Sequence, residues 1–136
     1  MKSMRGFNLV ELIITTTIVV IFAAIAIPSY LDFSRRDYYS GVIEVTMLYK
    51  TAVEKCYESR RTLKGCNGGT HDIPANIKTP KENIATLTVS NGVIAAIPVK
   101  GSGITEKDTY VLTPSIVKQE VSWAASGVAV DKNYTD

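Results

Sequence analysis

The feature that most constrains this chain is an apolar run near its N-terminus, at residues 7–27. These 21 residues contain a single charged side chain, Glu11. As a helix they would rise about 31 Å, close to the thickness of the hydrocarbon core of a bilayer. Lys2 and Arg5 precede the run, and no acidic residue does. The positive-inside rule therefore predicts that the short basic end stays in the cytoplasm and the rest of the chain is exported.

Glu11 needs an explanation, because a carboxylate in hydrocarbon costs roughly 2.5–3.5 kcal/mol on insertion scales. One interpretation places it near the interface, where its side chain reaches water. A second treats the run as a secretory signal, with a cleavage site of the form Ala24-Ile25-Ala26. Against it, Glu11 would interrupt the apolar core of such a signal, and the run is long. A plain single-pass anchor is the third, and it gives Glu11 no role.

The residues around Glu11 favour a more specific interpretation. Residues 6–12 read Gly-Phe-Asn-Leu-Val-Glu-Leu behind a short basic leader. This pattern resembles the class III leader junction and the mature N-methylphenylalanine terminus of type IV pilins, in particular type IVa. The resemblance implies that a prepilin peptidase cleaves between Gly6 and Phe7 and methylates the new amine of Phe7. It also implies that Glu11 pairs with that amine on a neighbouring subunit during assembly.

This interpretation divides the chain into three parts. Residues 1–6 are the leader, residues 7–33 are the hydrophobic membrane anchor and later the filament core, and residues 34–136 are an exported globular domain. The chain has 15 Lys and Arg against 13 Asp and Glu, and the leader holds two of the basic residues. The remainder is therefore neutral, which gives no support to DNA as a partner, although DNA stays possible.

The two cysteines, Cys56 and Cys66, are expected to form a disulfide because an exported domain lies in an oxidising compartment. Zinc is a poorer alternative, since His71 is the lone further soft ligand and the spacing fits no zinc signature. His71 lies in a stretch of loop composition. No motif of a nucleophile, a metalloprotease or a phosphate-binding loop is present. We therefore expect no enzymatic activity, no cofactor and no metal site.

Pro28 follows the apolar run, and we expect the helix to kink or unwind there and then continue. Arg60 and Arg61 lie near the expected end of the helix, where they would complement its dipole. A DNA or lipid contact is the alternative for these arginines. Between these points one face of the helix carries a seam at spacings of three and four, which should face a sheet rather than form a short coiled coil: Tyr38, Val42, Val45, Tyr49, Ala52 and Cys56.

The second half of the chain has a strand pattern. We expect strands at residues 85–89, 93–99, 109–113 and 117–125, with an Asn91-Gly92 hairpin turn between the first two. Pro114 should stop the third strand, and Val121 and Trp123 should share one face of the fourth. The predicted fold class is α+β, a long N-terminal helix packed on about four antiparallel strands, which is the pilin fold.

The tryptophan of the last strand is present, but the cysteine that follows it in many type IVa pilins is absent. The disulfide-bounded C-terminal loop of those pilins is therefore missing. The Cys56–Cys66 pair resembles a different arrangement, which occurs in a subset of pilins.

The resemblance implies a structural subunit of a type IV pilus, which polymerises through its N-terminal helix into surface filaments for adhesion, twitching motility or DNA uptake. Its expected partners are copies of itself in a helical filament, the prepilin peptidase, the inner-membrane assembly platform and, before assembly, the membrane. It would lie first in the bacterial inner membrane and then in the extracellular pilus.

Three alternatives remain open: a type II secretion pseudopilin, a minor or DNA-receptor pilin, and a membrane-anchored binding domain or enzyme. Against the pseudopilin, Asp131 and Asp136 alone do not supply the six to eight oxygens of a calcium loop.

Overall fold

The structure is a computed structural model that describes residues 8–135, without the side chains of residues 22–29. The chain divides into two compact units, Met1–Phe33 and Ser34–Asp136. Helix α1, Leu9–Arg60, contributes residues to both units. In the first unit, the described part consists of Asn8 and the first turns of α1. The second unit, called the head below, holds the rest of α1 and everything that follows it.

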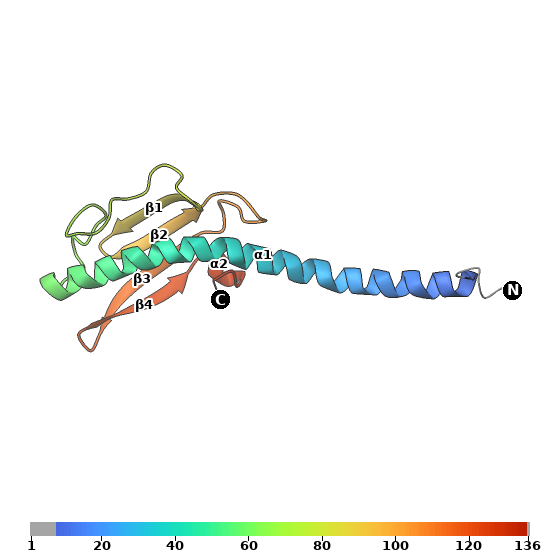
Figure 1. The fold of residues 1–136 in the computed structure, drawn as a ribbon. Coiled ribbons are helices and arrows are strands. Elements are labelled where there is room, and N and C mark those ends of the chain that lie inside the picture. The colour runs from blue at the N-terminus through green and yellow to red at the C-terminus, as the bar shows by residue number, and fades with distance from the viewer. Residues whose placement is uncertain (1–7, 136) are drawn as a thin grey trace. The chain divides into compact units, whose positions relative to one another are not determined.

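The head contains a four-stranded antiparallel sheet in the order β1-β2-β3-β4, so each strand pairs with its neighbour in sequence. Residues 34–60 of α1 pack on this sheet (Figure 1). A short helix, α2 at Val128–Asp131, follows the last strand. The predicted α+β fold is therefore confirmed. The strands are β1 at Ile84–Ser90, β2 at Val93–Pro98, β3 at Tyr110–Val117 and β4 at Glu120–Ser126.

The buried seam of α1 differs slightly from the predicted one. Val42, Tyr49 and Cys56 are buried as expected, whereas Tyr38, Val45 and Ala52 are only partly buried and flank the core. In each of these three cases the next residue along the chain is fully buried instead. A seam with spacings of three and four can be drawn in two ways, which share every second residue and differ by one position at the others. The predicted seam left out Thr46 because its side chain is polar. Its hydroxyl can be buried because it donates a hydrogen bond to the carbonyl of Ile43 at 2.8 Å. The fully buried positions are Tyr39, Thr46 and Val53.

The Asn91-Gly92 hairpin turn is confirmed. Both residues have positive φ, 49° and 84°, as a two-residue turn of this kind requires, and Ser90 pairs with Val93 directly beside it. An added Cβ at Gly92 would approach a side-chain carbon of Pro114 to 3.0 Å. Glycine therefore serves both the backbone conformation and the close packing of this turn.

The boundary between the last two strands was predicted wrongly. Strand β3 continues through Pro114 to Val117, and the turn is formed by Lys118 and Gln119, which have φ of 52° and 68°. Strand β2 pairs with β3 only at residues 110–112, so Pro114 lies where no ladder bond to β2 is required. The Lys-Gln pair lacks the glycine or asparagine that makes such a turn recognisable in a sequence. Beyond Leu112 the β3–β4 hairpin is thus a two-stranded extension of the sheet.

Candidate functional site

The start of α1 is closed by a reciprocal pair of hydrogen bonds between Asn8 and Glu11. The Glu11 N–H donates to Asn8 Oδ1 at 3.0 Å, and the Asn8 N–H donates to Glu11 Oε2 at 3.2 Å. This is a capping box, in which two unpaired amides of the first helical turn are satisfied by two side chains. The spacing of Asn8 and Glu11 could have predicted it from the sequence. Gly6 and Phe7, the predicted cleavage site, lie outside the described residues.

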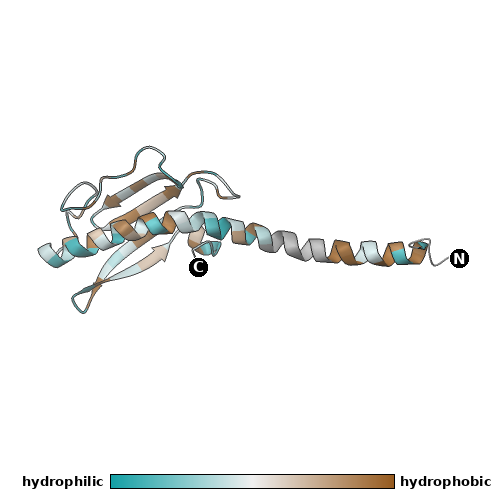
Figure 2. Cartoon of the chain, in the orientation of Figure 1, coloured by the Kyte–Doolittle hydropathy of each residue, from teal (hydrophilic) through white to brown (hydrophobic). Residues whose placement is uncertain are grey.

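The first turns of α1 present an apolar surface in the single chain (Figure 2). Thr16 and Thr17 do not interrupt it, because their hydroxyls donate to the carbonyls of Leu12 and Ile13 at 2.8 Å. A continuous exposed surface of this kind marks contact with lipid or with other protein chains. Its large residues are all 48–72% exposed: Leu9, Val10, Leu12, Ile13, Ile14, Ile18, Val19, Val20 and Ile21.

Within the part of the chain that the structure describes, no helix has both the length and the apolar character needed to cross a membrane. The span expected at residues 7–27 includes Phe7 and the side chains of residues 22–27, which lie outside that part. Helix α1 is continuous in secondary structure through Pro28, and the expected kink stays a prediction.

In the head, Cys56 and Cys66 form the predicted disulfide, with their Cα atoms 6.1 Å apart. Both cysteines are buried. The loop that the disulfide closes is hydrogen-bonded to the β1–β2 turn: the Gly92 N–H donates to the Cys66 carbonyl at 2.9 Å, and the Asn91 N–H donates to Asn67 Oδ1 at 2.8 Å. The disulfide, its loop and the hairpin turn are therefore one connected structure.

A buried carboxylate ties the C-terminus to the loop before β3. Asp108 is 1% exposed, accepts a hydrogen bond from the Thr105 N–H at 2.8 Å and forms an ion pair with Lys132 at 2.9 Å. Burial by itself raises the pKa of Asp108, but the bonds from Thr105 and Lys132 outweigh it and hold the pKa below its ordinary value of 3.8. The Tyr39 hydroxyl donates to the Asp108 carbonyl at 2.7 Å, which fixes this loop to α1. Sequence reasoning missed this cluster.

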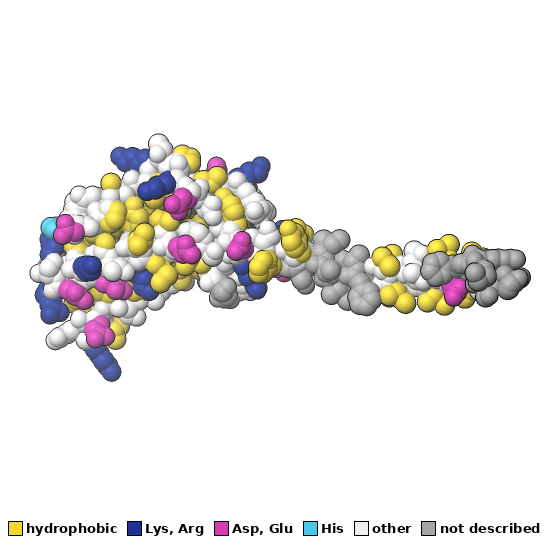
Figure 3. Space-filling model, viewed as in Figure 1, with side chains coloured by type: hydrophobic (Ala, Val, Ile, Leu, Met, Phe, Trp, Pro, Cys, Tyr) yellow, Lys and Arg dark blue, Asp and Glu magenta, His cyan; other side chains and the backbone are white. Residues whose placement is uncertain are grey.

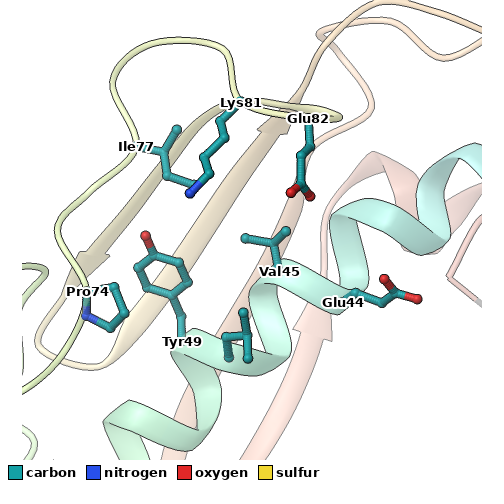
Figure 4. A pocket seen from close by; sticks show the side chains of 8 residues that line it. Glu44, Val45, Tyr49, Pro74, Ile77, Lys81 and Glu82 are labelled. Carbon is teal, nitrogen blue, oxygen red and sulfur yellow. The ribbon is translucent and has the colours of Figure 1, made fainter.

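A groove of about 500 Å³ runs between α1 and the segment that crosses to β1 (Figure 4). Its floor is apolar, since the Tyr49 hydroxyl is satisfied by the Ala75 carbonyl at 2.7 Å. Lys81 and Glu82 point across the groove toward α1, whereas Glu44 points away from it. A second hollow along α1 shares Leu48 and Pro74 with the groove and continues it. The lining residues are Glu44, Val45, Leu48, Tyr49, Pro74, Ile77, Lys81 and Glu82.

Among residues 8–135, no group of three His, Cys, Asp or Glu side chains is placed to hold a metal ion. His71 is exposed in a turn, and Asp131 is exposed in α2. Asp136 lies outside the described residues.

The chain matches no protein-family model. It is 33% identical over 95 residues to "Prepilin peptidase-dependent protein D" of Escherichia coli strain K12, covering 70% of this chain and 64% of that protein. It is 33% identical over 103 residues to "Type IV major fimbrial protein FimA" of Dichelobacter nodosus, covering 73% and 66%.

A third relative is "Type IV major pilin protein PilE1" of Neisseria gonorrhoeae, 32% identical over 108 residues, which are 76% of this chain and 47% of that protein. The chain thus spans between about half and two thirds of the length of these relatives. These relatives are named as pilins, fimbrial proteins or a prepilin peptidase-dependent protein, which agrees with the predicted family. The structure has the expected α+β fold, with a four-stranded sheet and a disulfide in the head. The chain therefore belongs to the type IV pilin family.

Proposed function

We propose that this protein is a structural subunit of a type IV pilus, which polymerises through its N-terminal helix into surface filaments. The observation that supports this most directly is the exposed apolar surface at the start of α1, where large side chains are 48–72% exposed. Such a surface is unfavourable in water and is covered by lipid or by the same surface of other copies. The relatives named as pilin and fimbrial proteins support the contact with other copies.

Processing comes before assembly in this proposal. A prepilin peptidase would cut between Gly6 and Phe7 and methylate the Phe7 amine, and the relative named as prepilin peptidase-dependent supports this step. The capping box holds the Glu11 carboxylate over the first turn of the helix, beside the positive end of its dipole. The new Phe7 amine of a neighbouring copy would then meet a positioned carboxylate. Pairing of the two charges would offset the cost of enclosing each in an apolar filament core.

Residues 7–33 would anchor the unassembled subunit in the inner membrane, where the pilus assembly platform takes it into a helical filament of copies of itself. The head, residues 34–136, would then face the outside in the extracellular pilus. Such filaments would serve adhesion, twitching motility or DNA uptake. The chain would catalyse no reaction itself.

The test is to shear surface filaments from the producing bacterium and to measure the mass of this chain in them. We expect a chain that begins at Phe7 and carries one N-terminal methyl group. A matched sample of the cell envelope should contain the same mature form, and only the uncleaved precursor if the peptidase is removed. A chain that begins at Ile27, or one found in the envelope but never in filaments, would refute the proposal.

A further inference from the structure

Two apolar surfaces of the head have no partner within the described residues, and they have opposite shapes. One is the hollow groove along α1 described above. The other is the projecting end of the β3–β4 hairpin, where Ile116 is 42% exposed and Val117 is 52% exposed. Hydrophobic side chains gather on the face of the head that carries α1, with acidic and basic side chains among them (Figure 3).

The end of the hairpin is exposed, although one side of it borders a hollow that Gln119, Glu120 and Val121 share with α1 of the same chain. Its last residues extend beyond the sheet, because β2 pairs with β3 only at residues 110–112. Ile116 and Val117 are adjacent in a strand, so they point to opposite faces of the hairpin and make its end apolar on both sides. Lys118 and Gln119 form the exposed turn beyond them.

The groove and the hairpin cannot meet within one chain. Trp123 of β4 lies against the flank of α1 that carries Glu54, whose Oε1 accepts from the indole Nε1 at 2.8 Å. The groove lies along the flank that carries Val45 and Leu48. At 3.6 residues per turn these two flanks are on opposite sides of the buried seam. Any contact between hairpin and groove must therefore join two copies.

The charges of the two surfaces are complementary. The groove is bordered by two acidic residues, Glu44 and Glu82, and one basic residue, Lys81. The hairpin carries Lys118 at its turn and Glu120 directly after it, so an incoming tip presents one charge of each sign to Lys81 and Glu82. Across the described chain, neither Glu82 nor Lys118 forms an ion pair. Glu82 points toward α1 over the groove, where a lysine of an incoming chain would meet it (Figure 4).

We infer that the β3–β4 hairpin of one copy docks in the α1 groove of the next, with Val117 against Leu48 and Lys118 beside Glu82. The inference rests on the proposed function and names the contact between heads. Because each copy gives one surface and receives the other, the contact is heterologous. Repetition of a heterologous contact produces a ring where its rotation closes and an open helical filament where it does not, and the proposed function requires the filament.

Cysteine cross-linking in assembled filaments tests the contact. The native cysteines are already paired in the disulfide, so added thiols are the reactive ones. We expect that a chain with both Leu48→Cys and Val117→Cys gives, on mild oxidation of sheared filaments, a ladder of dimers, trimers and longer covalent oligomers. Each single variant is the matched control and should stay monomeric. Dimers from Val117→Cys alone would show hairpin meeting hairpin and would overturn the inference, as would monomers from the double variant.

Charge reversal gives an independent measurement. Lys118→Glu should lower the amount of filament by about tenfold, the change that corresponds to 1.4 kcal/mol of contact energy. Adding Glu82→Lys to the same chain should restore it. Lys107→Glu should have no effect, because Lys107 is exposed in the loop before β3 and belongs neither to the groove nor to the hairpin. Normal filaments from Lys118→Glu, or no rescue, would contradict the contact. If wild-type chain is absent from filaments, the proposed function fails and this inference fails with it; if it is present, these variants judge the inference alone.

Discussion

The indole N–H of Trp123 donates a hydrogen bond to the Glu54 carboxylate at 2.8 Å, which joins the last strand of the sheet to the long helix. The Lys50 ammonium lies 5.9 Å from the centre of the Trp123 ring, so the same side chain also meets a cation. Glu54 and Lys50 both belong to α1, so two charged side chains of the helix hold the hairpin against it.

Glu54→Ala should lower the free energy of unfolding by about 1 kcal/mol, because the indole N–H then loses its acceptor. Glu54→Gln should lose less, since its amide oxygen can still accept. Trp123 is the lone tryptophan of the sequence, so its fluorescence in denaturant titrations of the full chain in detergent reports the change directly. Glu58→Ala, one turn away and exposed, is the control. Equal losses from Glu54→Ala and Glu58→Ala would mean that the bond contributes nothing specific.

Replacing Cys56 and Cys66 by serine should lower the free energy of unfolding by about 3 kcal/mol, the value expected for a short closed loop. The loss should not remain local. The loop is hydrogen-bonded to Asn91 and Gly92, so amide exchange should accelerate at the β1–β2 turn as well as at residues 65–74. Exchange at the β3–β4 turn should stay as in the wild type and serves as the internal reference. Unchanged exchange at Asn91 and Gly92 would show that the turn holds without the loop.

Stability in acid should depend on Asp108. Its pKa is held below 3.8 in the folded chain, so its contribution is present above the unfolded pKa and is lost as pH falls through the folded pKa. Asp108→Asn should therefore be destabilised by about 1–2 kcal/mol near pH 7, and the difference from wild type should shrink toward about pH 2. Asp131→Asn, at an exposed position, should follow the wild-type curve. A difference that stays constant with pH would exclude the carboxylate charge as its cause.

The charge and the cap of Glu11 can be separated by substitution. Glu11→Gln keeps an oxygen that can accept the Asn8 N–H but removes the charge, whereas Asn8→Ala removes one half of the cap and keeps the charge. If the carboxylate pairs with the amine of a neighbouring copy, Glu11→Gln should export and mature normally but enter filaments poorly. Asn8→Ala should enter them at close to the wild-type level. Electron microscopy of filaments and the mass of the envelope form provide the two measurements, and the reverse order of effects would assign Glu11 to helix capping alone.

The sequence allowed prediction of those parts that depend on local pattern. Asn91-Gly92 specifies its turn by backbone preference, and the spacing of Val42, Tyr49 and Cys56 specifies a helix face. The prediction that Pro114 ends the third strand was wrong. A strand tolerates a proline where no neighbouring strand needs its missing N–H, and the local sequence does not show where the neighbouring strand ends.

The candidate sites divide in the same way. The two cysteines and the Asn8–Glu11 cap can be recognised from residue type and spacing. Asp108 cannot, because its partner Lys132 is 24 residues away and only the folded chain brings the two together. The groove is likewise invisible in the sequence, since α1 and the segment before β1 form it jointly. Such features arise from tertiary packing rather than from local preference.

The end of the β3–β4 hairpin, which does not pair with β2, has a consequence for how this protein can change over generations. Residues 113–119 lie beyond the reach of β2, and Ile116 and Val117 are exposed, so substitutions there cost the core little. Natural variation can therefore accumulate at this tip without loss of a folded head. The groove along α1 is part of the same chain, so a variant tip and the groove that it would enter are encoded by one gene. Selection for assembly therefore acts on both surfaces together.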